Sequence, residues 1–123
     1  MTSMVHIFQP EHYEGLLRSM IDIWRHEGFN SDARSSHFNG AVQGGSNTDI
    51  VFADAYLKGV RGKVNWEDAF KSMVSNAEEV PPKNNDPRDP SGSTKEGRGA
   101  IEDWLKYNFL TTDSTRSVSR AVE

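Results

Sequence analysis

The sequence predicts an all-α fold, and two observations support this class. The 123-residue chain contains several stretches in which apolar residues recur at helical spacing, each bounded by a capping residue, a glycine or a proline. It shows no run with the apolar–polar alternation of a strand and no internal repeat of fixed period. Its length suits one ordinary domain or part of a larger one. We therefore expect helices joined by irregular segments.

The first helix is predicted over residues 10–27, after an N-terminal tail of residues 1–9. Pro10 suits the first turn, where its missing N–H is not needed. Between Tyr13 and Trp24 the apolar residues follow mostly an i, i+3, i+4, i+7 spacing, which is typical of an amphipathic helix. Gly28 is a suitable stop just past its C-terminus.

A second helix is predicted over residues 47–59. Asn47 or Thr48 would cap its N-terminus. The segment Ile50–Leu57 is apolar almost all round, and such a helix is normally buried on more than one side.

The third predicted helix has clear boundaries. Asn65 is an N-cap candidate, and Asp68 lies three residues later as in a weak capping box. Pro81 and Pro82 stop the helix. A single apolar stripe is expected to face the core: Trp66, Ala69, Phe70, Met73, Val74 and Ala77.

Two segments read as irregular, and the chain ends inside a helical pattern. Residues 28–46 form a long glycine-rich loop of the kind that is usually functional or disordered. Residues 81–99 hold most of the prolines and form an irregular surface loop. Residues 111–123 begin a last helix, so we expect a truncated chain. Before it, a shorter helix presents three apolar residues on one face: Ile101, Trp104 and Leu105.

Composition disfavours several classes of function. The net charge is −4, which offers no basic face for nucleic acid. Without cysteine there are no disulfides, thiolate metal sites or cysteine nucleophiles. We expect no membrane segment, because no apolar run approaches the roughly 20 residues that a spanning helix needs. No signal peptide is visible at the N-terminus.

The segment Gln43–Asp49 is the most suggestive local motif. Its glycines lead into a helix N-terminus, where backbone N–H groups bind anions or sugar hydroxyls. It is not a P-loop, because no Lys-Ser/Thr pair follows the glycines. The plain alternative is a tight loop with a capping residue.

Other polar residues allow a functional and a structural interpretation. Asp22 and His26 are four residues apart and share a helix face. Either they act together, as a general base with the residue that orients it or as a metal-binding pair, or they are an ordinary surface pair near a helix C-terminus. Asp54 lies in the most apolar helix, so it either anchors another segment or faces a cavity.

Several long segments in a fixed order resemble glycoside hydrolase family 92, most closely its fungal members. The resemblance covers nearly the whole chain from about Pro10 onward. The segments that carry it are Ile21–Gly28, Gln43–Gly59, Asn65–Ala69, Ala77–Pro81, Glu96–Gly99 and Thr115–Glu123.

The resemblance implies an exo-acting α-mannosidase that depends on calcium and inverts the anomeric centre. It also implies that residues 10–123 are part of an α/α toroid catalytic domain, an incomplete arc of helical hairpins that leaves apolar faces uncovered. In the family, the turn from Gly45 to Asp49 lies near the mannose-binding pocket. The candidate substrate-binding residues are therefore Ser46, Asn47, Asp49, Asp54, Glu96 and Arg98.

Inverting hydrolysis requires a carboxylic acid and a carboxylate base roughly 6.5–9.5 Å apart. In the family these residues lie C-terminal to the matched segments, and most calcium ligands lie outside them. We therefore expect a fragment that is inactive alone, with mannose-containing glycans and the remaining parts of the parent enzyme as its partners. The family also suggests secretion. The alternative is a stand-alone helical interaction module without catalysis; a helical enzyme that uses Asp22 and His26 is a third hypothesis.

Overall fold

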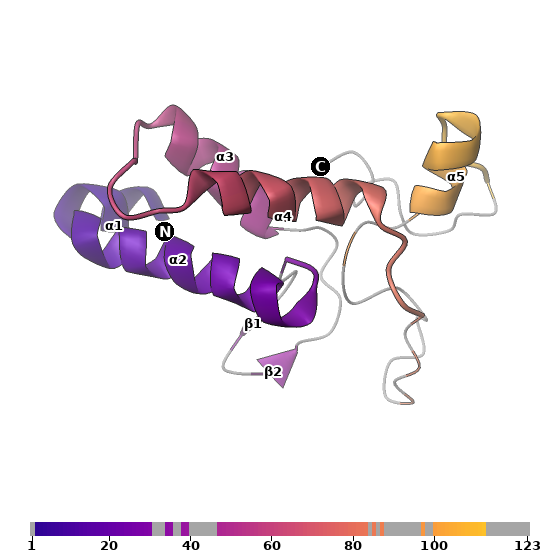
Figure 1. Cartoon of the computed structure of the whole chain (residues 1–123), viewed down its shortest axis with the longest axis horizontal. Helices are drawn as coiled ribbons and strands as arrows, with labels where there is room; N and C mark the ends of the chain where they lie inside the picture. Colours follow the sequence, from indigo (N-terminus) through magenta and orange to yellow (C-terminus); the bar gives the residue numbers. More distant parts are fainter. Residues whose placement is uncertain are drawn as a thin grey trace.

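The computed structural model describes residues 2–30, 34–35, 38–39, 47–83, 85, 87, 97 and 100–112. These residues form five helices and one short antiparallel strand pair, which confirms the predicted all-α class (Figure 1). The elements are α1 (Thr2–Phe8), α2 (Pro10–Glu27), β1 (Arg34–Ser35), β2 (Phe38–Asn39), α3 (Asn47–Leu57), α4 (Trp66–Glu78) and α5 (Ile101–Tyr107). The two-residue strands pair within the segment that the sequence predicts as a loop.

Helix α2 has the bounds that the sequence predicts. Gly28 ends it in the left-handed conformation with φ of 85°, and its N–H donates to the Trp24 carbonyl at 2.7 Å. The predicted N-terminal tail is different in the structure, because most of it forms α1. This helix packs on α2, and the rings of His6 and Tyr13 lie 5.6 Å apart.

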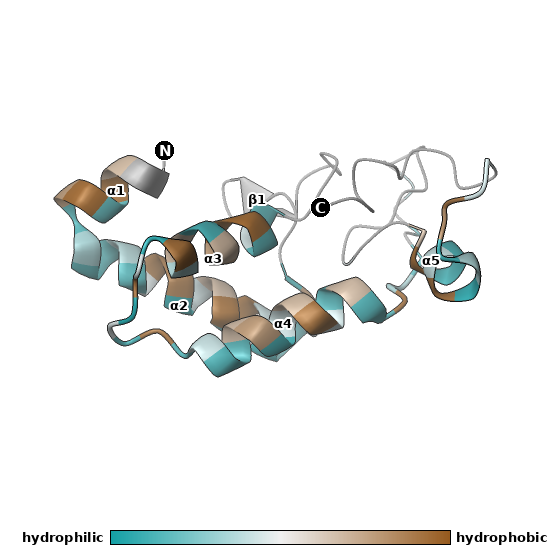
Figure 2. Ribbon diagram, turned by 90° about the horizontal axis from the view of Figure 1, so that it is seen from above, coloured by the Kyte–Doolittle hydropathy of each residue, from teal (hydrophilic) through white to brown (hydrophobic). Residues whose placement is uncertain are grey.

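The hydrophobic core lies between α2, α3 and α4, which Figures 1 and 2 show grouped together. Helix α2 contributes its three buried residues, and α3 and α4 add smaller or aromatic ones. Two valines in the connection between α3 and α4 complete the group. Its members are Tyr13, Leu17, Ile21, Phe52, Ala55, Val60, Val64 and Ala69.

Helix α3 is less covered than its apolar sequence predicts. Phe52 and Ala55 are fully buried, but Ile50 is 49% exposed and Leu57 is 85% exposed. The expectation of burial on more than one side is therefore wrong for the described residues. One face of α3 packs on the core, and the other carries apolar side chains at the surface.

Helix α4 begins as predicted but buries a different row of residues. The Asn65 side chain accepts a hydrogen bond from the Asp68 N–H at 3.1 Å, which confirms the cap. Along the predicted stripe, Ala69 is buried while Phe70 is 62% exposed. The buried row continues instead through Ser72 and Asn76, because both polar side chains find hydrogen-bond partners inside the protein.

Helix α5 lies apart from this group, beyond the C-terminal end of α4 (Figure 1). Of its predicted apolar face, Ile101 is buried, whereas Trp104 and Leu105 are each more than half exposed. Apart from Thr111 and Thr112, the predicted last helix lies outside the described residues, as does most of the loop at 81–99. Among the described helices, none is both long and apolar enough to cross a membrane.

Candidate functional site

A buried carboxylate joins the three core helices at the start of α3. Asp49 lies in the first turn of α3 and is only 6% exposed. Its Oδ1 accepts a hydrogen bond from Asn30 Nδ2 at 2.6 Å, and its Oδ2 accepts one from Asn76 Nδ2 at 2.8 Å. Asn30 follows the turn after α2, and Asn76 belongs to α4. We call these three residues the Asp49 node.

The Asp49 node is a buried group of hydrogen-bonded polar side chains inside an apolar core. A carboxylate in the first turn is favoured by the positive end of the helix dipole, and an ionised carboxylate only accepts hydrogen bonds. Both asparagines must therefore turn their nitrogen atoms toward Asp49. Their Oδ1 atoms are left buried without a hydrogen-bond partner. The geometry fixes the N-terminus of α3, which directly follows the glycine-rich segment in the sequence.

The structure describes three of the six predicted substrate-binding residues, Asn47, Asp49 and Asp54, and their surroundings differ. Asn47 is exposed at the first position of α3, whereas Asp49 is turned into the core. Ser46, Glu96 and Arg98 lie outside the described residues. A role of these residues in sugar binding stays a prediction.

Asp54 is not a buried anchor for another segment. Its carboxylate pairs with Lys58 Nζ at 2.6 Å on the same helix, and both side chains are more than one third exposed. Its charge also acts on Tyr13: burial raises the pKa of that phenol, and Asp54 raises it further.

Asp22 is paired with Arg25, not with His26 as a catalytic or metal pair would require. Arg25 Nη1 donates to Asp22 at 2.6 Å, and Arg25 Nε donates to Asp68 on α4 at 3.0 Å. The hydrogen bonds to Asp68 and Asp22 raise the pKa of the guanidinium. The pattern is a surface bridge between α2 and α4, so neither interpretation of an Asp22–His26 pair is confirmed.

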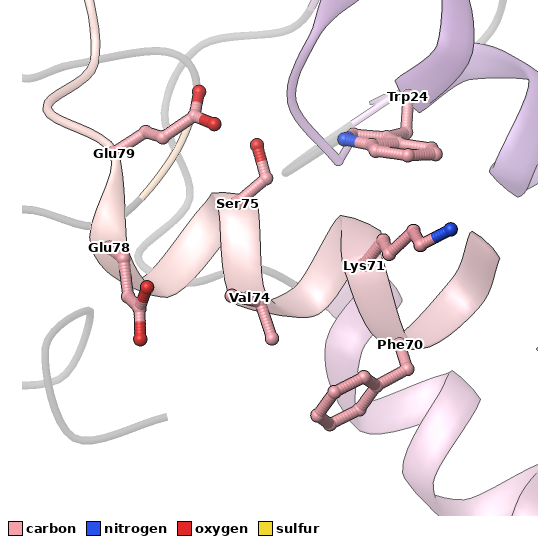
Figure 3. A pocket seen from close by; sticks show the side chains of 7 residues that line it. All are labelled: Trp24, Phe70, Lys71, Val74, Ser75, Glu78 and Glu79. Carbon is pink, nitrogen blue, oxygen red and sulfur yellow. The ribbon is translucent and has the colours of Figure 1, made fainter. Parts of the chain in front are cut away.

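An open groove of about 380 Å³ lies between the C-terminal halves of α2 and α4 (Figure 3). Figure 3 shows the indole ring of Trp24 above α4, with Lys71 below it and Ser75 beside it, and with Glu78 and Glu79 farther along α4, pointing to opposite sides of the helix. The lining residues are Trp24, Phe70, Lys71, Val74, Ser75, Glu78 and Glu79. Sequence analysis missed this groove, because its residues are brought together only by the packing of two helices.

The described residues do not form a calcium site. No three acidic or histidine side chains gather in the part of the chain that the structure describes. Both oxygen atoms of the one strongly buried carboxylate, Asp49, accept hydrogen bonds from amides, whereas Ca²⁺ takes 6–8 oxygen ligands. A calcium ion bound at the Asp49 node would face amide donors.

Comparisons with known proteins give a single family. Residues 1–123 match the catalytic domain of glycosyl hydrolase family 92. The chain is also 34% identical over 113 residues to an uncharacterized secreted glycosidase of Arthroderma benhamiae. That alignment covers 85% of this chain and 14% of the relative, so the chain spans about one seventh of the relative's length. No solved structure matches.

Proposed function

The chain belongs to glycosyl hydrolase family 92, and from this we propose that it forms a helical arc of the catalytic domain of a glycan-hydrolysing enzyme, an exo-acting α-mannosidase. The observation that carries the proposal is the family match over all 123 residues. Mannose as the substrate sugar, calcium dependence and inversion rest on the resemblance of the sequence to this family. The substrates are then mannose-containing glycans.

In this proposal the described helices hold in place the start of α3, which follows the glycine-rich segment in the sequence. The Asp49 node anchors the first turn of α3 to the end of α2 and to α4. The exposed Asn47 is the first residue of the helix and follows Ser46 in the sequence. We assign sugar contacts to Asn47 together with Ser46, and we assign Asp49 the task of holding that end of the helix in place.

Catalysis itself is assigned to other parts of a longer protein. An inverting enzyme needs one carboxylic acid and one carboxylate on opposite sides of the scissile bond. Of the described aspartates, those at positions 22, 49, 54 and 68 are each held by an amide or a cationic side chain, and Asp103 accepts hydrogen bonds from Thr111. We therefore propose that the acid, the base and the calcium ligands come from the remaining parts of the enzyme.

Exposed apolar side chains support an arc within a larger domain over a stand-alone interaction module. Ile7 and Phe8 of α1 are at least 70% exposed, and Leu57 of α3 is 85% exposed. Large apolar patches on a soluble protein mark surfaces that contact other protein. A module that works alone is expected to melt cooperatively as a monomer and to bind no hydrophobic dye, whereas an arc is expected to bind the dye or to self-associate.

The proposal is tested on the longer protein that carries this segment, isolated from its source cells. That protein is incubated with α-linked mannobiose, with added calcium and separately with a chelator. Proton NMR of the first product is expected to show β-mannose, and the chelator is expected to abolish its release. The purified 123-residue chain serves as the comparison and is expected to release none.

Two results would contradict this assignment. If the longer protein cleaves another glycoside but no α-mannoside, the substrate class is wrong. If the 123-residue chain alone releases mannose, the acid and base lie within it, contrary to our assignment.

A further inference from the structure

The groove between α2 and α4 combines a flat aromatic wall with hydrogen-bonding groups at its end. The indole of Trp24 faces α4 across the groove (Figure 3). The volume of about 380 Å³ lies within the range of about 300–1,000 Å³ that is usual for small-ligand sites. From this arrangement we propose that the groove binds a neutral hexose unit of a glycan.

The aromatic wall suits one face of a pyranose ring. An aromatic face carries partial negative charge, and the C–H groups on one face of a hexose are weakly positive. Trp24 is half-buried and rests against the hydrophobic core, so its ring is held in place before a ligand arrives. A fixed aromatic side chain loses little conformational entropy on binding.

The polar groups suit the hydroxyl groups of the same sugar. Glu78 and Glu79 are exposed acceptors at the end of α4. Lys71 Nζ has three N–H donors, of which one is directed to Glu67 at 2.7 Å. Ser75 Oγ donates to the Gly28 carbonyl at 3.2 Å and keeps its lone pairs for a hydroxyl donor. Donors and acceptors are thus both present, as a sugar requires.

Charge disfavours the other ligand classes. Two carboxylates repel a phosphate or an acidic peptide, and the single lysine is already paired with Glu67. Charged groups beside the ring disfavour a purely apolar ligand, because burying them unpaired is costly. A neutral, polyhydroxylated ring suits both the aromatic wall of the groove, on which it stacks, and the polar groups, to which its hydroxyl groups hydrogen-bond.

Two of the groove residues on α4, Val74 and Glu78, lie on the side of the helix opposite to the Asp49 node. Val74 and Glu78 each follow a node-side residue, Ser72 or Asn76, by two positions, which is about 200° around a helix of 3.6 residues per turn. Glu78 and Glu79 are both exposed, and neither is one of the amide partners of Asp49, so we expect their substitution to leave the core contacts of Asp49 in place. This separation makes the groove testable by itself.

The test is a titration of the 123-residue chain with α-linked mannobiose, followed by the NMR signal of the Trp24 indole N–H. The signal is assigned with the Trp24→Phe variant, which keeps a flat ring against the core. We expect a saturable shift of the Trp24 signal. The E78Q/E79Q double variant is expected to weaken binding about tenfold, as the loss of hydrogen bonds to charged acceptors implies. The matched control, Glu102→Gln on α5, is expected to bind like the parent chain.

Three outcomes would overturn the inference. The first is the absence of any shift at Trp24, and the second is equal binding by the E78Q/E79Q variant. The third is binding by the chain but none at Trp24 in the longer protein, which would mean that another segment covers the groove.

The choice of mannose rests on the proposed function, and the two tests fail separately. Hydrolysis of α-mannobiose by the longer protein without a shift at Trp24 removes the groove site and leaves the proposed function. A shift at Trp24 without hydrolysis removes the α-mannosidase assignment and leaves the groove as a sugar site.

Discussion

Two aspartates in this protein have the same position in their helices and opposite surroundings. Asp49 lies in the first turn of α3, and Asp68 lies in the first turn of α4. Each accepts a hydrogen bond from the region of α2, Asp49 from Asn30 and Asp68 from Arg25. Asp49 is almost fully buried among neutral amides, whereas the Asp68 side chain is 23% exposed and faces a charged guanidinium that is itself exposed.

The difference shows that exposure to water, more than the type of hydrogen bond, determines how much such a contact contributes to the stability of the fold. Water replaces a lost partner at the surface, so an exposed ion pair adds little stability. Inside the core no water replaces the partner, and a donor left alone keeps its full desolvation cost. We therefore expect the buried contact of Asp49 to contribute much more to the stability of the fold than the exposed bridge of Asp68 does.

The largest effect is expected from removing the buried carboxylate. Asp49→Ala leaves the Nδ2 groups of Asn30 and Asn76 without an acceptor inside the protein. We expect the free energy of unfolding to fall by roughly 2–6 kcal/mol, because each of the two buried donors left without a partner costs about 1–3 kcal/mol. Chemical denaturation followed by circular dichroism measures the loss.

The matched control for that variant is Asp49→Asn. An asparagine at this position keeps the shape and lets one neighbouring amide turn its free Oδ1 atom toward the new N–H₂ group. We expect a clearly smaller loss than for the alanine variant. Equal losses for the two variants would mean that Asp49 contributes volume and not hydrogen bonds.

How far the sequence predicts this fold depends on whether the signal is local. The bounds of α2 follow from Pro10 and Gly28, and the start of α4 follows from Asn65, because each residue acts on its own helix end. The tail at residues 1–9 carries no such signal, yet most of it forms a helix that packs against α2.

The candidate site was less predictable, because its contacts are not local. The partners of Asp49 are 19 and 27 residues away in the sequence, beyond two loops. The composition of α3 indicates that the helix is apolar. It does not indicate which face of the helix packs against the core. In α4, Ser72 and Asn76 are polar in sequence and buried in the structure. A pattern of apolar residues does not show that a polar residue has a buried partner.

A smaller effect is expected from Asp68→Asn, which tests the exposed side of the comparison. The substitution removes the charge that faces Arg25 but keeps the shape, and Arg25 keeps Asp22 as a second partner. We expect only a small fraction of the loss seen for Asp49→Ala. Added salt is expected to reduce the difference between the parent and the variant further, because it screens surface charges.

Denaturation of both proteins at low and high salt measures this effect. A loss as large as that of Asp49→Ala, or one that salt leaves unchanged, would show that the surface bridge is as important as the buried node.

The smallest effect at neutral pH is expected at Tyr13, where a buried polar atom has no partner. The Tyr13 hydroxyl is buried without a hydrogen bond, unlike the two aspartates. Tyr13→Phe removes an atom that already bears its desolvation cost, so we expect the free energy of unfolding to stay equal or to rise by at most about 1 kcal/mol. A clear loss of stability at neutral pH would show that the hydroxyl has a partner in solution.

The same variant has a pH dependence with a definite sign. Burial raises the pKa of Tyr13 above its ordinary value, with a further contribution from Asp54. The folded protein then holds the phenolic proton more tightly than the unfolded chain does. The stability linked to this proton is complete below about pH 10, the ordinary phenol value, and is lost as the pH rises through the raised pKa. Denaturation of the parent and of Tyr13→Phe between neutral and alkaline pH isolates this contribution, because lysines and arginines titrate alike in both. The advantage of the variant is expected to grow above about pH 10, and a constant difference would mean that the phenol ionises as easily in the folded protein as in the unfolded chain.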